Sequence, residues 1–345
     1  MWAVRISRRE VMAILRSKLF RAAVSLLLIG VLLATVDLGE LGGTLKHVVP
    51  GLLAMAVFVF LVTNMANVLK WRLIIRAQGD HVSWPYLTST FYMGLFFNNF
   101  LPTNFGGDLV RVYKLSRATG SRVGATSSVV MDRASSTFAL LLIALVAALL
   151  ELRLLGARLA LTILAMFLAF ILIAGVFASE RAARRLAGFP CLRGGLFGLR
   201  HHLRSFYLSV NQFRGERRTV AAVLAISIVY QGLYVVSVNL LAFSLGIHLP
   251  VAYYFLFIPI VLAVGMVPLS MNGLGVREGA WVLLFTQAGV PAPEALSMSV
   301  LNFLMITVVS MMGGIFYLLD PALPEPRGNA VISLPEPQGK SLNGR

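Results

Sequence analysis

The sequence predicts an all-α polytopic membrane protein with about six full transmembrane helices and two re-entrant helical hairpins. Three observations predict this fold class. Hydrophobic residues make up 58% of the chain and charged residues only 13%, against roughly 25% charged in ordinary soluble domains. Apolar runs of about 18 residues or more recur along the chain, the length that a helix needs to cross a bilayer. Two of the apolar stretches are interrupted by glycine-rich breaks, at 98–111 and 268–278.

The distribution of basic residues predicts the topology. The net charge is +16, yet Lys and Arg gather in loops that alternate along the chain, which is the positive-inside pattern. We therefore expect a multi-pass cytoplasmic (inner) membrane protein with both termini in the cytoplasm, and no nucleic-acid binding. In this arrangement the basic residues that face outward are Lys46, Arg153 and Arg158.

A single transmembrane domain is expected over 1–320. Its linker, 179–218, is rich in arginine and has an apolar–basic helical pattern, which predicts a helix lying in the membrane interface. The tail, 321–345, is rich in Pro, Gly and Asn and is predicted to be disordered. The predicted full spans are about 20–36, 48–69, 125–150, 159–178, 219–245 and 295–319. The second of these is followed by an expected interfacial anchor, Lys70-Trp71-Arg72.

The two interrupted stretches are predicted to be hairpins. Stretch 85–100 lies between two basic clusters that both favour the cytoplasm, so a full span there would place one cluster outside. A re-entrant hairpin with its return helix at about 108–118 removes this conflict, and 251–290 forms a second hairpin from the outer side. Repeat one, about 48–150, and repeat two, about 219–319, then run in opposite directions. Such an inverted-topology repeat is the architecture of many secondary transporters.

The first break has the residue types of an anion site. Gly106 and Gly107 allow the backbone to turn and to approach a ligand closely. Asp108 and Arg111 are three residues apart and should share a helix face. A helix N-terminus beside an arginine at membrane depth is suited to phosphate. The alternative is that Asp108 only caps its helix and pairs with Arg111.

The second break repeats this composition. Gly273 and Gly275 precede Arg277 and Glu278. Adjacent residues point about 100° apart on a helix, so one of the two charges could face a cavity and the other a partner helix. Charged groups within a bilayer are costly and mark functional pathways by default.

Other polar residues at membrane depth have weaker assignments. Asp132 and Arg133 are expected to balance charge, with Asp132 binding Arg111 or Arg277. Asn98 and Asn99 could bind a headgroup or satisfy free carbonyls where the helix breaks. The remaining amides are expected to link helices by hydrogen bonds; they are Asn64, Asn67, Gln231, Asn239 and Asn302.

No cofactor or metal site is predicted. Cys191 is the only cysteine, and the pair His201-His202 lacks metal-ligand spacing. A P-loop-like ending at Gly339-Lys340 lacks the earlier glycine that a P-loop requires.

The motifs at the breaks resemble the lysylphosphatidylglycerol synthase transmembrane family (flippase-like, UPF0104), over roughly residues 20–320. The resemblance implies a membrane portion that moves lipids between leaflets, notably aminoacylated phosphatidylglycerol, and some relatives are linked to polyprenyl-linked sugars. The soluble aminoacyl-transferring domain of the fused members is missing here, so we do not expect this chain to make lysyl-lipid. The motifs are Asn99-x-x-Pro102, Gly106-Gly107-Asp108-x-x-Arg111, Asp132-Arg133 and Gly273-Leu274-Gly275-Val276-Arg277-Glu278.

The leading hypothesis is a lipid flippase or transporter of a bacterial or archaeal inner membrane, not an enzyme, that moves an anionic or phosphate-bearing envelope lipid between leaflets. Arg111 and Arg277 would hold the lipid phosphate, while Asp108, Glu278 and Asp132 would balance charge or read a cationic headgroup. Its partner would be a membrane phospholipid or a polyprenyl-linked lipid; a homo-oligomer or a partner lipid-modifying enzyme remains open. The alternatives are an integral membrane transferase, with Asp108 or Glu278 as base, and a small-solute transporter with the same inverted repeat.

Overall fold

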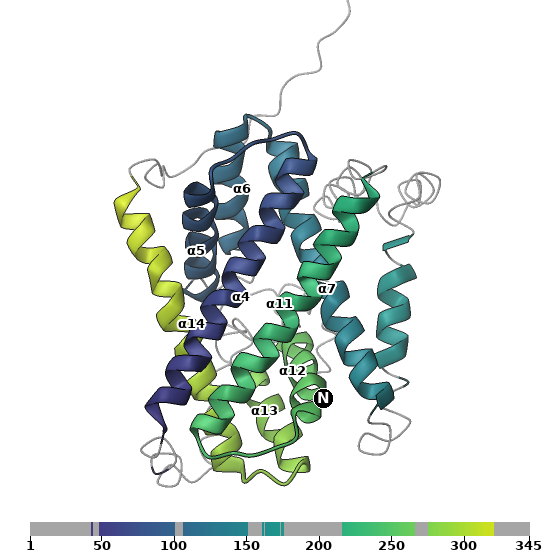
Figure 1. Ribbon diagram of the computed structural model, residues 1–345, viewed down its shortest axis with the longest axis vertical. Helices are drawn as coiled ribbons and strands as arrows, with labels where there is room; N and C mark the ends of the chain where they lie inside the picture. The colour runs from purple at the N-terminus through teal and green to yellow at the C-terminus, as the bar shows by residue number, and fades with distance from the viewer. Residues whose placement is uncertain are drawn as a thin grey trace, which may run out of the picture.

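The computed structural model describes residues 43, 48–100, 106–150, 161, 163–172, 174–175, 216–265 and 275–320. Every element of regular secondary structure in these ranges is a helix (Figure 1). The predicted helix at 20–36, most of the linker and the tail lie outside the described residues. The central segments of the two breaks, 101–105 and 266–274, lie outside them as well.

The described helices are α4 (Pro50–Ala77), α5 (Trp84–Phe100), α6 (Gly106–Thr119), α7 (Arg122–Leu150), α11 (Arg217–Ser244), α12 (Val251–Gly265), α13 (Val276–Gln287) and α14 (Ala292–Leu319), with a shorter helix at Ile163–Leu172. Four of them are long and apolar enough to cross a membrane: α4, α7, α11 and α14. The chain is therefore a polytopic helical membrane protein, as the composition predicted.

Helix α4 corrects one prediction. It continues to Ala77, about two turns beyond the predicted end. Lys70 and Trp71 are fully buried inside the bundle and are not part of an interfacial anchor. The sequence pattern was misleading because a buried lysine becomes tolerable once a carboxylate pairs with it, and that partner, Asp132, comes from a distant part of the chain.

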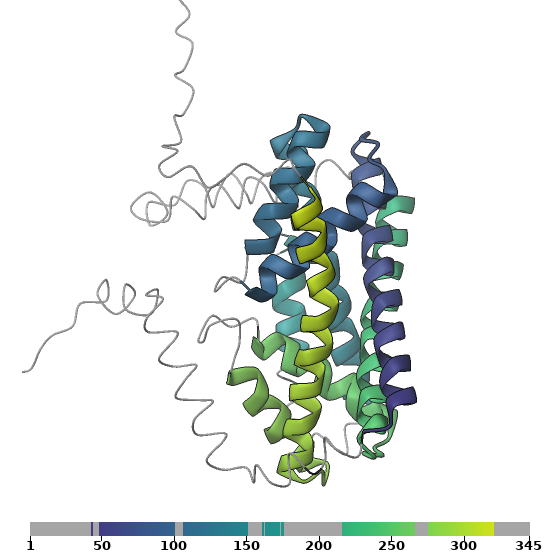
Figure 2. The same ribbon diagram turned by 90° about the vertical axis from the view of Figure 1, so that its left-hand side faces the viewer.

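The shorter helices form two packed pairs in opposite halves of the molecule. Helix α5 packs on α6, and α12 packs on α13. In Figures 1 and 2 the first pair lies in the upper half and the second in the lower half. Each pair contacts a long helix that is distant in sequence: α5, in the N-terminal half, packs on α14, and α12, in the C-terminal half, packs on α7. The long helices α4 and α11 pack closely against each other. The polar centre of the bundle is thus enclosed by segments from both parts of the chain.

Glycines fix how closely these helices approach. A Cβ atom at Gly107 on α6 would overlap the carbonyl group of Gly94 on α5. A Cβ atom at Gly313 on α14 would likewise overlap the carbonyl group of Tyr92 on α5. Small residues at helix contacts allow backbones in a membrane to pack closely. Helix α5 is therefore held tightly between α6 and α14, which sets the position of the charged residues on α6.

Candidate functional site

A cavity of about 260 Å³ lies at the centre of the bundle, and side chains from seven helices line it. Charged lining residues come from α6 and α7, whereas uncharged polar ones come from α4, α5, α7 and α11. The polar residues of the lining are Asn64, Asn67, Asn98, Arg111, Asp132, Arg133, Ser136, Thr137, Tyr230, Gln231 and Tyr234. Of the predicted site residues, the structure places Asn98, Arg111, Asp132 and Arg133 together in this wall.

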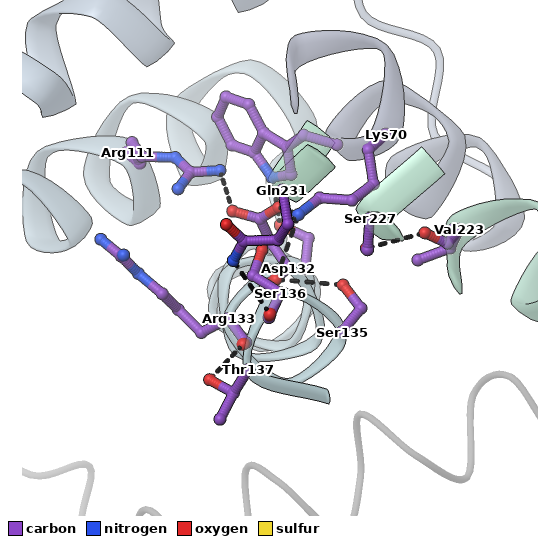
Figure 3. A network of polar contacts seen from close by, with 12 residues as sticks. Lys70, Arg111, Asp132, Arg133, Ser135, Ser136, Thr137, Val223, Ser227 and Gln231 are labelled. Atoms are coloured by element: carbon purple, nitrogen blue, oxygen red, sulfur yellow. Dashed lines mark hydrogen bonds and ion pairs between the residues drawn. The ribbon is translucent and has the colours of Figure 1, made fainter. Parts of the chain in front are cut away.

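Asp132 on α7 is the centre of a buried charged cluster (Figure 3). Its carboxylate lies 2.8 Å from Nζ of Lys70 on α4 and accepts a hydrogen bond of 2.9 Å from Nη2 of Arg111 on α6. Lys70 also donates to Oγ of Ser136, one turn along α7, at 2.5 Å. One carboxylate thus connects three helices.

Asp108 and Arg133 form a second ion pair beside the first. Nε and Nη2 of Arg133 donate to the two carboxylate oxygens of Asp108 at 2.9 and 2.8 Å. Arg111 also lies near Asp108, at 3.7 Å. Asp132 therefore binds Arg111, one of the two partners predicted for it, whereas Asp108 lies closer to Arg133 of α7 than to Arg111, the neighbour predicted as its partner. Helix packing brings α6 alongside α7, and this tertiary contact overrides the local spacing.

Among the described residues, the charges of this cluster do not cancel. Three cationic groups, Lys70, Arg111 and Arg133, meet two carboxylates, Asp108 and Asp132, so three minus two leaves one positive charge. The undescribed segments 101–105 and 266–274 contain no charged residue that could balance it. Lys70 and Arg111 are almost fully buried, whereas the Arg133 side chain is 53% exposed. An unbalanced cation at membrane depth is suited to bind an anion.

Aromatic groups hold Arg111 in place. Its guanidinium carbon lies 4.2 Å from the centre of the Trp71 ring and 5.4 Å from that of Phe91. Trp71 is itself fixed, because its Nε1 donates to Oγ of Ser128 at 3.1 Å. The Nε atom of Arg111 is buried and has no hydrogen-bond partner. Cation–π contacts strengthen when they are desolvated, so this arginine is oriented before any ligand arrives.

The two asparagines of α5 have different positions. Oδ1 of Asn98 accepts a hydrogen bond from the backbone N–H of Gly107 at 2.8 Å, which ties α5 to the start of α6. Nδ2 of Asn99 donates to Thr307 and Ser310 on α14, at 3.0 and 3.3 Å. Asn98 lines the cavity and Asn99 anchors α5 to α14. Gly106 is buried at the first turn of α6.

The second break is described from Gly275 onward, so Gly273 lies outside the described residues. Gly275 has φ +82°, a conformation that favours glycine, and its N–H donates to Oε2 of Glu278 at 2.6 Å. Arg277 binds Oε1 of the same carboxylate at 2.9 Å. Although adjacent residues leave a helix about 100° apart, the ends of these two long side chains meet in this ion pair. Arg277 and Glu278 are not among the residues lining the cavity.

The chain is similar to known proteins over most of its length. The family model described as the lysylphosphatidylglycerol synthase TM region matches residues 18–314. The chain belongs to this family. The chain is also similar to two proteins described as UPF0104 membrane proteins of Methanothermobacter thermautotrophicus. One is 24% identical over 309 residues, covering 81% of this chain and 87% of the relative; the other is 23% identical over 294 residues, covering 80% and 87%.

Membership of the lysylphosphatidylglycerol synthase transmembrane family confirms the resemblance predicted from the two breaks. The match spans most of the chain, because the matched region begins before α4 and ends within α14. The matched region includes the undescribed residues that lie between 18 and 314. Within the described residues, no group of three or more His, Cys, Asp or Glu side chains could hold a metal ion.

The roles of Lys70, Asn64 and Asn67 at this site were not predicted from the sequence. Lys70 was assigned to an anchor, and Asn64 and Asn67 to hydrogen bonds between helices. In the structure Asn64 and Asn67 line the cavity, and one amide atom of each is buried without a hydrogen-bond partner. A signal was available, because Thr63, Asn67 and Lys70 recur at helical spacing and mark one polar face of α4. The mean hydropathy of the segment does not reveal such a face.

Proposed function

We propose that this protein is a lipid transporter that moves an anionic or phosphate-bearing envelope lipid between the leaflets of the membrane. The observation that carries the proposal is the excess positive charge of the cluster around the central cavity. The lipid phosphate would enter between Arg133, which is accessible, and Arg111, which is fixed by Trp71. The acyl chains would stay in the bilayer, because the cavity has room for a headgroup only.

The arrangement of the helices supports an inverted-topology repeat. Exchanging α4 with α11, α5–α6 with α12–α13, and α7 with α14 converts most of the observed contacts into other observed contacts: α5 with α14 becomes α12 with α7, and α6 with α7 becomes α13 with α14. The contact of α7 with α11 has no counterpart of similar extent between α14 and α4. The two short pairs lie in opposite halves (Figure 1). Inverted repeats with broken helices at the midplane are typical of transporters that alternate access between the two sides.

The second hairpin has an assigned role in this proposal. Arg277 lies on α13, the helix that the exchange pairs with α6, on which Arg111 lies. Gly275 and Glu278 shape the start of α13 around it. We propose that Arg277 contacts the phosphate in the arrangement that opens toward the opposite leaflet, and that Gly273 belongs to the same binding segment. Asn99 would keep α5 and α14 moving together.

The contacts of the carboxylates weigh against the transferase alternative. Asp108 uses both oxygens to accept bonds from Arg133. Glu278 accepts bonds from Gly275 and Arg277. A general base must reach the proton it removes, and in both residues intramolecular donors occupy the carboxylate oxygens.

Leaflet exchange in proteoliposomes tests the proposal. We expect wild type to exchange fluorescent phosphatidylglycerol, and Arg111→Gln to slow exchange about tenfold or more, because removing a hydrogen bond between charged groups costs about 1.5–3 kcal/mol. Arg111→Lys keeps the charge and should retain part of the rate. Arg72→Gln is the matched control, since Arg72 also lies over a tryptophan, Trp84, at 5.4 Å but does not line the cavity.

Each variant is first shown to elute as a single species and to unfold near the wild-type temperature in detergent. Exchange at the wild-type rate by well-folded Arg111→Gln would remove Arg111 from the lipid path. Absence of exchange by wild type, for phosphatidylglycerol and for a polyprenyl-phosphate lipid alike, would contradict lipid transport.

A further inference from the structure

We infer that the ion pair between Asp108 and Arg133 is a latch, which the phosphate group of the ligand opens. While the site is empty, Asp108 holds Arg133 and so ties the first turn of α6 to α7. An entering phosphate group takes the place of Asp108 and releases that turn. This inference rests on the proposed function and names how the same site is regulated.

Asp108 binds the donor atoms that a phosphate group needs. Its two oxygens accept hydrogen bonds from Nε and Nη2 of Arg133, and its Oδ1 lies 3.7 Å from Nη1 of Arg111. Carboxylate and phosphate groups bind a guanidinium group with the same two-point geometry. Both arginines line the cavity, whereas Asp108 is not among the lining residues and contacts them from outside it. A phosphate group in the cavity therefore competes with Asp108 for the same donors.

The two ion pairs that join α6 to α7 differ in burial. In the inner pair, the side chains of Arg111 and Asp132 are 4% and 3% exposed. In the outer pair, which is the latch, those of Arg133 and Asp108 are 53% and 12% exposed. Breaking a buried ion pair leaves an uncompensated charge, whereas an accessible pair contributes little stability. An anion can therefore open the outer pair while the inner pair stays closed.

The charge of the cluster favours this exchange of partners. Its described residues carry one excess positive charge, and a phosphodiester brings one negative charge. Bound phosphate and Asp108 would then be two anions around the same arginines. Like charges at close range in a site of low dielectric repel strongly, so Asp108 moves away once the phosphate group is bound.

Movement of Asp108 would carry α5 along with α6. Oδ1 of Asn98 on α5 accepts a hydrogen bond from the N–H of Gly107, the residue before Asp108. The backbones touch at the same place, because a Cβ atom at Gly107 would overlap the carbonyl group of Gly94. Asn99 in turn binds α5 to α14. Opening the latch thus lets these three helices turn against α7 about the inner pair.

Anion binding by Asp108→Asn tests the competition. Purified protein in detergent is titrated with inorganic phosphate and, separately, with short-chain phosphatidylglycerol, and the dissociation constants are measured. If the latch is closed in about nine of ten empty molecules, removing it tightens apparent binding about tenfold. Tightening for either compound supports the latch, and the compound that binds more tightly identifies the source of the phosphate group.

Glu294→Gln is the control for Asp108→Asn. It makes the same change of charge in the first turn of α14, at a residue that does not line the cavity, and it should bind both compounds as wild type does. Wild-type or weaker binding of both compounds by Asp108→Asn that unfolds near the wild-type temperature would overturn the competition.

A distance measurement tests the movement without altering the latch. Spin labels are attached to Leu109→Cys on α6 and Leu149→Cys on α7, both exposed positions, in a Cys191→Ser background. Saturating short-chain phosphatidylglycerol or inorganic phosphate should change the distance between the labels. Adding Asp108→Asn should produce the changed distance without ligand.

The control pair of labels lies on two helices that pack closely together, α4 and α11. Phe58→Cys and Val236→Cys are exposed positions on these helices, and their distance should stay constant. An unchanged distance between α6 and α7 when binding is saturated would overturn the latch.

These measurements separate failure of the latch from failure of transport, because neither of them needs leaflet exchange. Tighter binding and a changed distance, in a protein that exchanges no lipid, would support the latch and contradict transport. Lipid exchange by wild type with a constant distance between α6 and α7 would overturn the latch and leave the proposed transport standing.

Discussion

Asp132 is the residue on which the charged cluster depends, because its one carboxylate pairs with two cations from two different helices. Lys70 and Arg111 are both nearly fully buried around it. Removing one partner of a buried ion pair is strongly destabilising, since the remaining charge is left without compensation. This explains why a chain with few charged residues keeps a carboxylate in the middle of a spanning helix.

We predict that Asp132→Leu lowers the free energy of unfolding by about 3–5 kcal/mol. The double variant Lys70→Met with Asp132→Leu should recover part of this loss, because one of the two unpaired cations is then absent. The measurement is thermal or denaturant unfolding of purified protein in detergent. Glu216→Gln, at an exposed position before α11, is the control and should change stability by about 0.5 kcal/mol or less. If Asp132→Leu unfolded with the wild-type free energy, the ion pairs of Asp132 would not contribute to the stability of the protein.

Individual charged residues could be located from the sequence, but their pairing could be predicted only in part. Asp108, Arg111, Asp132 and Arg133 were all singled out because charges at membrane depth are rare. The pair Asp132–Arg111 was one of two alternatives predicted for Asp132, whereas the pair Asp108–Arg133 depends on the contact between α6 and α7, which no local spacing encodes. Lys70 was misassigned because it follows an apolar run and precedes Trp71, a pattern that also marks membrane interfaces.

At the scale of the elements, α5 is fixed between α6 and α14 by backbone contacts that only glycine allows. Gly313 on α14 faces the carbonyl group of Tyr92, and Asn99 donates to Thr307 on the same helix. Lys114 on α6 also pairs with Asp320 at the end of α14. Helices α5, α6 and α14 should therefore move together as one body during the proposed transport.

Gly313→Ala tests this packing. The added methyl group would overlap a backbone carbonyl that cannot rotate away, so we predict a loss of about 1–3 kcal/mol of stability, typical of overpacking. Gly232→Ala, on α11, is the matched control because nothing lies within 4 Å of the added Cβ. There the better helix propensity of alanine should leave stability unchanged or raise it by up to about 1 kcal/mol. Equal unfolding temperatures for the two variants would contradict close packing of α5 on α14.

Most helix boundaries were predictable, for a physical reason. The predicted and observed ends agree within three residues for α5, α7, α11 and α14, because long apolar runs ended by charges or Pro define a helix that crosses a bilayer. Helix α4 was the exception, because its last two turns carry charged residues that the bundle buries or that end the helix. A hydropathy scale reflects the free energy of moving a side chain from water into lipid. It does not account for a polar side chain that is buried against other helices of the protein.

At the scale of the whole molecule, the family membership and the helical membrane fold follow from the sequence, whereas the cavity does not. Seven helices contribute to its wall, so its existence depends on how the two parts of the chain pack together. The proposed inverted repeat accounts for this packing. One short helix pair lies in each half of the bundle (Figure 2), α5 with α6 in one half and α12 with α13 in the other.

The central claim, that the headgroup crosses through this cavity, is tested most directly by a cysteine placed in its wall. Thr137 on α7 lines the cavity, and Cys191 is the only native cysteine, so the variant is Thr137→Cys with Cys191→Ser. Ala118→Cys in the same background is the control, at an exposed position on α6 away from the lining. The measurement is leaflet exchange before and after reaction with a small thiol reagent. We predict that modification stops exchange only for Thr137→Cys and that added phosphatidylglycerol slows its modification; exchange that continues after complete modification of Thr137→Cys would contradict a path through the cavity.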